Sequence, residues 1–126
     1  MKNEEMTIKK VSELLGVSTW TIRRMHQNGM VPHVRRSRAG YLVFGPEQIE
    51  ILRILIDLKK AGMPRKNLKR LAGLIRRGNE TLAEQKAMLE TQKRNFWQEL
   101  EDVQHGIDVI ERQVEVIEQK MGIDKP

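Results

Sequence analysis

The chain contains no cysteine. The absence of thiols excludes disulfide bonds, metal sites built on thiolates and redox sensing by cysteine. A long hydrophobic run is also missing, because the most apolar stretch, IEILRILIDL from Ile49, is interrupted by Glu50, Arg53 and Asp57. This stretch is too polar to span a membrane, and the charged start MKNEEM does not resemble an export signal. We therefore expect a soluble protein of the cytoplasm.

Signatures of catalysis are missing as well. The sequence shows no paired carboxylates, no nucleophile with an evident base and no glycine-rich phosphate loop. Its three histidines, His26, His33 and His105, fall in different expected elements and lack the spacing of metal ligands. For a chain of about one-domain length, we therefore predict no enzymatic activity, no metal and no cofactor.

Acidic residues are scarce in the first part of the chain. Residues 1–79 contain 17 Lys and Arg against 6 Asp and Glu, a net charge of +11. Residues 80–126 contain 6 against 11, a net charge of −5. A basic part suits a polyanion, because each cation laid on a phosphate releases counterions, whereas an acidic part is repelled by the same polymer. The alternative is a basic surface that is merely solvated, and charge alone does not decide between the two.

What the front part does contain is the pattern of two short helices joined by a tight turn. Thr7 precedes the first helix and Gly16 ends it in a position that favours a left-handed cap. Ser18 is a good N-cap for the second helix, which runs to about residue 28. The first helix has one apolar face, made of Ile8, Val11, Leu14 and Leu15. In a basic context this pattern predicts a helix-turn-helix.

The second helix divides its residues between core and surface. Val17 is expected to pack on Ile22 as a hydrophobic staple, with Met25 also facing the core. The outward residues are Trp20, Arg23, Arg24 and Gln27. The two arginines beside the tryptophan have three possible roles: they bind a phosphate backbone, stack on a partner, or form a solvated helix face. The pattern leaves all three open.

A hairpin and two more helices are expected next. Residues 34–36 and 41–44 read as paired strands around SRAG, with Gly40 supplying the positive φ angle. A hairpin directly after a helix-turn-helix is a wing. Helices follow over residues 46–61 and from near Pro64. In the first of these helices, the residues at helical spacing are Ile49, Leu52, Ile56 and Lys59 or Lys60. In the second, an apolar stripe comprises Leu68, Leu71, Ala72 and Ile75.

From Glu80 a helical pattern continues without proline to Pro126. Its heptad stripe comprises Leu82, Leu89, Phe96, Leu100, Val103, Ile107, Ile110, Val114, Ile117 and Met121. A helix ending at Met121 would be about 63 Å long at roughly 1.5 Å per residue, longer than the front part can cover. We therefore predict a homodimer rather than a helix folded back on its own domain. The charges beside the stripe leave the pairing direction open.

These patterns predict a mainly α fold with two domains, a winged helix-turn-helix over residues 1–79 and a coiled-coil dimerisation helix over residues 80–126. Phe96 and Trp97 lie together on the long helix. They are expected to belong to its core, since aromatics at helical spacing usually do. The alternative is a small ligand pocket against the front domain of the other subunit.

Five stretches in this order, GVSTWTIRR, NGMVP, RRSRAGY, LKKAGMP and GNETLAEQKAML, cover nearly the whole chain. They resemble the MerR family of bacterial transcription regulators, in particular short members whose coil runs to the C-terminus without a separate effector domain. The resemblance implies an antiparallel coiled-coil dimer that binds a pseudo-palindromic promoter site and distorts the DNA for RNA polymerase. A small-molecule effector stays unidentified. The alternative function is an architectural or chromosome-organising DNA-binding protein.

The resemblance also implies residue roles. Arg23 matches the arginine that grips DNA from the recognition helix, and Arg36 and Tyr41 match wing residues expected near phosphates. The predicted DNA-binding residues are Thr19, Trp20, Arg23, Arg24, Gln27, Arg35, Arg36 and Tyr41. The predicted dimerisation residues are Leu89, Phe96, Leu100, Val103, Ile107, Ile110, Val114 and Ile117.

The chain departs from the family pattern in two places. Arg24, Met25 and His26 stand where two aromatics and an acid are usual, and Leu42 stands where an arginine is common. Two familiar contacts are therefore missing. Arg24 is a candidate to replace one of them, by binding a phosphate or a guanine edge.

Overall fold

The computed structural model describes residues 5–122 and divides the chain into two compact units, with the boundary between Met88 and Leu89. The domain boundary expected after residue 79 falls earlier, at a short turn. Residues 1–4 and 123–126, the outer ends of the two expected domains, lie outside the described residues.

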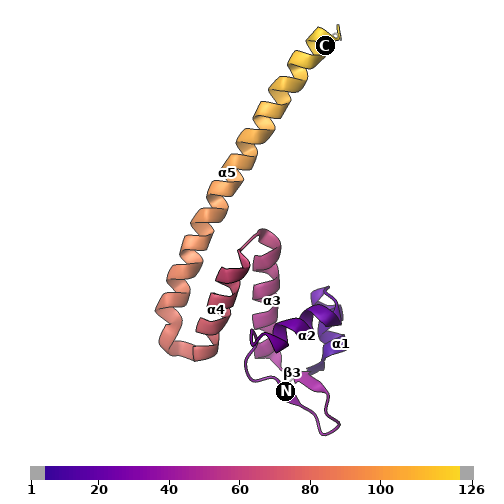
Figure 1. Cartoon of the computed structure of the whole chain (residues 1–126), viewed down its shortest axis with the longest axis vertical. Coiled ribbons are helices and arrows are strands. Elements are labelled where there is room, and N and C mark those ends of the chain that lie inside the picture. Colours follow the sequence, from indigo (N-terminus) through magenta and orange to yellow (C-terminus); the bar gives the residue numbers. More distant parts are fainter. Residues whose placement is uncertain (1–4, 123–126) are drawn as a thin grey trace. The chain divides into compact units, whose positions relative to one another are not determined.

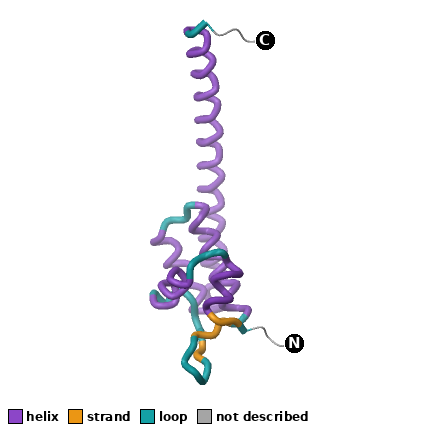
Figure 2. The backbone as a smooth tube through the Cα atoms, turned by 90° about the vertical axis from the view of Figure 1, so that its right-hand side faces the viewer, coloured by secondary structure: helices purple, strands orange, loops and turns teal. Residues whose placement is uncertain are grey.

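The first unit, which ends at Met88 and which we call the front unit, is mainly helical with a small sheet (Figures 1 and 2). The elements are, in chain order, β1 (Met6–Thr7), α1 (Ile8–Leu15), α2 (Thr19–Gln27), β2 (Arg35–Arg36), β3 (Leu42–Phe44), α3 (Pro46–Ala61), α4 (Arg65–Arg77), η1 (Gly78–Thr81) and α5 (Leu82–Lys120). This order confirms the predicted fold class, a winged helix-turn-helix followed by one long helix. None of the helices within residues 5–122 is apolar over a length that could cross a membrane.

The two helices of the helix-turn-helix begin and end where their capping residues predict. The side-chain oxygen of Ser18 accepts a hydrogen bond from the Thr21 backbone N–H at 3.1 Å, and Thr7 caps α1 in the same way. Gly16 adopts the left-handed conformation at φ 69°. One expected core position is wrong, because Leu14 is 48% exposed. Successive helix residues point about 100° apart, so Leu14 lies at the outer edge of the apolar face, whereas Leu15 packs against the core.

The sheet has one strand more than the predicted wing. β3 lies between β1 and β2 and pairs antiparallel with both, with Met6 opposite Phe44 and Arg36 opposite Leu42. The β1 strand has two residues, too few to show an alternating pattern, and it forms because β3 offers a free edge. The wing strands are shorter than predicted, while Gly40 has the expected positive φ of 89°.

The core of the front unit joins the helix-turn-helix, the sheet and α3. Its buried members are Val11, Ile22, Val31, Leu42, Phe44, Ile49, Leu52 and Ile56. Val17 and Met25 pack against it, as the staple predicts. Besides the expected Ile49, Leu52 and Ile56, α3 buries Ile51 and Leu55, whereas Lys59 and Lys60 at its end are exposed.

The end of α4 differs from the predicted stripe. Leu74 is buried and Ile75 is half-buried, because the chain turns back at η1 against the end of α4. The fully buried hydroxyl of Thr81 lies 2.6 Å from the Leu74 carbonyl oxygen and 2.9 Å from that of Gly78. Gln85 donates to the same hydroxyl at 3.0 Å. This turn moves the start of the long helix from the expected Glu80 to Leu82.

Candidate nucleic-acid interface

The outer surface of α2 has two edges. Ile22 is fully buried, while Trp20, Arg23, Arg24 and Gln27 are exposed as predicted. Successive residues of an α-helix point about 100° apart, so the neighbouring arginines point to opposite edges of this surface. The two edges meet different parts of the front unit.

The first edge borders a hollow of about 390 Å³ that we call the Arg23 groove. It is lined by Arg23 from α2, by Arg36, Gly40, Tyr41 and Leu42 from the wing, and by Thr7, Ile8 and Lys9 at the start of α1. The groove therefore combines three cations with an exposed phenol, drawn from elements that are distant in the sequence. This chemistry suits a phosphate backbone, which takes hydrogen bonds from arginine, lysine and tyrosine.

The wing holds one of these cations in place. The Arg36 guanidinium donates to the Gly40 carbonyl oxygen at 2.8 Å across the hairpin turn. The turn itself is closed by a hydrogen bond from the Gly40 N–H to the Ser37 carbonyl oxygen at 2.9 Å. Ordering an arginine before it meets a ligand reduces the entropy that binding must otherwise remove.

The second edge of α2 carries Trp20 and Arg24. The Arg24 guanidinium lies over the Trp20 ring, 5.0 Å from its centroid, which is within the range of a cation–π contact. Neither residue lines the Arg23 groove. The eight predicted residues thus fall into separate groups, and only Arg23, Arg36 and Tyr41 come together in that groove.

Arg35, Thr19 and Gln27 have different surroundings. Arg35 pairs with Glu5, just before β1, so part of its charge is neutralised within the chain. Thr19 is half-buried and Gln27 is exposed at the last residue of α2. None of the three lines the Arg23 groove.

Two relevant residues were missed in the sequence. Lys9 lies in a helix read only for its apolar face, yet it completes the Arg23 groove. Arg76 of α4 donates to the Gly29 carbonyl oxygen and so ties α4 to the turn that ends α2. For Lys9, the one available signal was the Lys-Lys pair after Ile8. For Arg76 no local signal exists, because Arg76 and Gly29 are 47 residues apart in the sequence.

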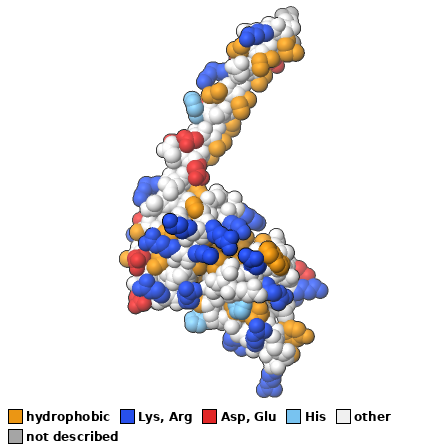
Figure 3. All heavy atoms as spheres, viewed as in Figure 1, with side chains coloured by type: hydrophobic (Ala, Val, Ile, Leu, Met, Phe, Trp, Pro, Cys, Tyr) orange, Lys and Arg blue, Asp and Glu red, His pale blue; other side chains and the backbone are white. Residues whose placement is uncertain are grey.

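Basic side chains gather over the front unit on the face drawn in Figure 3, and an apolar row follows the long helix. On α5 the predicted dimerisation residues are exposed, except for Phe96, which is half-buried. Trp97 is exposed too. The stripe is therefore available for a partner.

The comparisons with known proteins agree with this architecture. Residues 6–73 match the model of the MerR HTH family regulatory proteins. A curated protein of Haemophilus influenzae, described as an uncharacterized HTH-type transcriptional regulator, is 30% identical over 105 residues, which are 83% of this chain and 78% of that protein.

Two solved structures are similar over most of the chain. One is HiNmlR, a MerR family regulator lacking the sensor domain, bound to promoter DNA, with a TM-score of 0.78, 26% identity and coverage of 95% of this chain and 92% of that chain. The other is a MerR family transcriptional regulator from Listeria monocytogenes, described as putative, with a TM-score of 0.79, 27% identity and coverage of 86% and 83%.

Proposed function

Since this chain belongs to the MerR family of transcriptional regulators, we propose that it binds a pseudo-palindromic promoter site as a homodimer and distorts that DNA. The observation that carries the proposal is the Arg23 groove, in which three cations and Tyr41 converge from α1, α2 and the wing. The similarity to a MerR regulator bound to promoter DNA supports the same ligand for this chain.

The two edges of α2 have different roles in this proposal. Arg23 grips the DNA from the recognition helix, while Arg36, Tyr41 and Lys9 hold the phosphates that fix its orientation. Arg24 reads sequence or backbone at the other edge, and Trp20 holds its guanidinium in place. A bidentate arginine on a guanine edge discriminates by about 1–3 kcal/mol, enough to give this chain its own operator.

The long helix supplies the two-fold symmetry. In this proposal residues 80–126 form the dimerisation region, with α5 (Leu82–Lys120) as its helix, and residues 1–79 form the DNA-binding domain. Each large apolar side chain that is buried contributes about 1.5–3 kcal/mol, so the eight dimerisation residues favour association strongly. The family resemblance supports antiparallel pairing. A two-fold dimer reads a site whose half-sites are related by the same axis.

Promoter DNA in bacteria lies in the cytoplasm, and the proposal includes that location. RNA polymerase is an indirect partner, because distortion of the DNA changes the spacing of the elements that the polymerase reads. Specificity then comes from the energy of deformation as well as from direct contacts.

Selection of bound duplexes from random DNA at fixed salt tests the function. We expect one enriched two-fold site, bound about 10³-fold or more tighter than bulk DNA. Selection without enrichment would instead favour an architectural DNA-binding protein, and it would refute a promoter-specific regulator. A search for the selected site upstream of neighbouring genes then identifies the regulated promoter.

A further inference from the structure

The second edge of α2 borders another hollow, of about 620 Å³, which we call the Trp20 groove. Its floor is apolar and comprises Val17, Met25, Met30, Leu55, Ile56 and Leu68. These residues come from the segments around α2 and from α3 and α4, all within the front unit. The volume falls within the roughly 300–1,000 Å³ typical of small-molecule sites.

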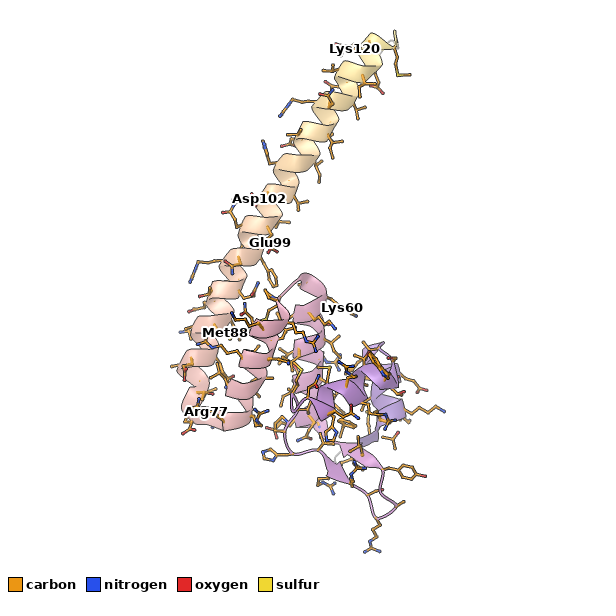
Figure 4. All side chains as sticks on the ribbon, in the orientation of Figure 1. Lys60, Arg77, Met88, Glu99, Asp102 and Lys120 are labelled. Atoms are coloured by element: carbon orange, nitrogen blue, oxygen red, sulfur yellow. The ribbon has the colours of Figure 1, made fainter. Side chains whose placement is uncertain are left out.

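The rim of this groove carries charge of one sign. Arg24 lies on α2, Lys59 and Lys60 lie at the C-terminal end of α3, and Arg65 begins α4. Figure 4 labels Lys60 on α3. Among the residues that line the groove, all of them within the described part of the chain, there is no Asp or Glu. The field of this rim therefore favours an anion.

The floor and the rim together select a class of ligand. A DNA phosphate uses the cations but leaves the apolar floor in contact with water, whereas a neutral hydrocarbon uses only the floor. A molecule with an aromatic or aliphatic body and one anionic group uses both. The two methionines on the floor adapt to bodies of different shape, because their side chains are flexible and polarisable.

We propose that the Trp20 groove binds a small amphipathic anion, with its carboxylate, sulfonate or phosphate on the basic rim and its body on the apolar floor. Binding engages Arg24, which otherwise faces outward from the recognition helix beside Trp20. The ligand therefore changes DNA affinity, and DNA changes ligand affinity by the same factor. This coupling rests on the proposed function, whereas binding of the anion does not.

A matched pair of probes tests the class of ligand without DNA. The first is 8-anilino-1-naphthalenesulfonate, and the second is N-phenyl-1-naphthylamine, which has the same rings without the sulfonate. By fluorescence titration of the full chain we expect the sulfonate to bind about tenfold tighter or more, because only it contacts the rim. Equal affinity would show unspecific apolar binding and would overturn the proposal.

Paired charge reversals test the place of binding. K59E with K60E reverses two rim charges, whereas K69E with R70E makes the same change on exposed residues of α4 outside the groove. We expect the rim variant to weaken the sulfonate probe by about tenfold, since two attractive charges become repulsive, and the control to weaken it by less than about twofold. Equal losses would mean that the probe senses only net charge. K59Q with K60Q serves as the milder variant if the reversal unfolds the chain by circular dichroism.

A tryptophan reporter separates this site from others. In a W97F variant the remaining tryptophan is Trp20, which lines the groove, so probe binding should quench its emission with the same midpoint as the titration. Unchanged Trp20 emission would place the probe elsewhere and refute the site. Inorganic phosphate lacks an apolar body, and displacement of the probe by phosphate at equal concentration would refute an amphipathic ligand.

A second copy of the chain is the competing occupant. If the V103D/I110D variant, which is designed to be monomeric, binds the probe and the native protein does not, then another protomer covers the groove and the proposal fails. We expect equal affinity in both proteins. The effect of the probe on operator binding is measured after this result. An unchanged operator affinity would then refute the coupling to DNA, while binding of the anion would still stand.

Discussion

The front unit and the long helix use their apolar residues in opposite ways. In the front unit Val11, Ile22, Phe44 and Leu52 are fully buried by segments of the same chain. On α5 nearly every residue of the heptad stripe is exposed. Their charges differ as well, with an excess of cations before residue 80 and of carboxylates after it. The front unit thus closes its own core and presents polar groups at its surface, whereas the open stripe of α5 is the basis on which we propose pairing with a second chain.

The largest expected effect concerns the exposed apolar stripe of α5. Changing Val103 and Ile110 to Asp places two carboxylates in the proposed dimer interface, and each unpaired buried charge costs about 3–5 kcal/mol. We expect monomers by analytical ultracentrifugation, with the front unit still folded by circular dichroism. The matched control changes His105 and Arg112 to Asp on the opposite face of the helix. A double variant that remains dimeric at the concentration of the control would rule out this interface.

The next effect tests the front unit. Replacing Arg23 with Ala should weaken binding to the selected operator by about 1–3 kcal/mol, or roughly 5- to 150-fold, while dimerisation stays unchanged. Fluorescence anisotropy at fixed salt gives the affinity, and ultracentrifugation gives the mass. R70A removes an exposed arginine of the same unit outside the Arg23 groove. If both variants lose the same small amount, Arg23 contributes only general charge.

Thr81 lies within the front unit, at the η1 turn that immediately precedes α5. Its hydroxyl is fully buried between the Leu74 and Gly78 carbonyl oxygens and also accepts from Gln85. T81V keeps the shape and removes all three contacts, so unfolding in urea should lose about 1–3 kcal/mol of stability. The exposed Thr91 provides the control, T91V, which should stay within about 0.5 kcal/mol of the native protein. If T81V leaves the free energy of unfolding unchanged, the turn is held by packing alone.

Local signals explain which parts of the fold were predictable. Ser18 and Gly16 satisfy backbone groups within a few residues, and the seven-residue period of α5 is set by helix geometry, so both are visible in the sequence. The β1 strand is different, because two residues form it only when β3 supplies the partner. The η1 turn likewise depends on Thr81 reaching back to Leu74.

The candidate site shows the same division. Arg23, Arg36 and Tyr41 stand in motifs, and the structure brings them together in one groove. Their use in DNA binding stays a prediction. Lys9 and the Arg76 contact with Gly29 were missed, since both depend on how distant elements pack. A sequence pattern names residues on one helix face, but it does not say which other elements complete the surface.

The smallest expected effect concerns backbone strain in the loop after α2. His33 has φ 62°, and among residues 5–122 it is the one non-glycine residue with a positive φ. The left-handed conformation costs a residue with a Cβ about 1–2 kcal/mol, whereas glycine adopts it freely but loses about 0.5–1 kcal/mol through its greater freedom when unfolded. H33G should therefore stabilise the protein by roughly 0.5–1 kcal/mol, measured by urea unfolding in the monomeric V103D/I110D background.

H33A is the control that separates backbone from side chain, because it removes the imidazole and keeps the Cβ. We expect H33A to gain nothing while H33G gains stability. Equal gains in both would mean that the histidine side chain, and not the backbone, is unfavourable there. A loss in both would mean that the exposed imidazole stabilises the loop before the wing. Since buried Pro32 and half-buried Val34 anchor the chain on either side, strain at this position is imposed by the closed core of the front unit. The α5 helix, whose stripe is open, imposes no such strain on any of its own residues.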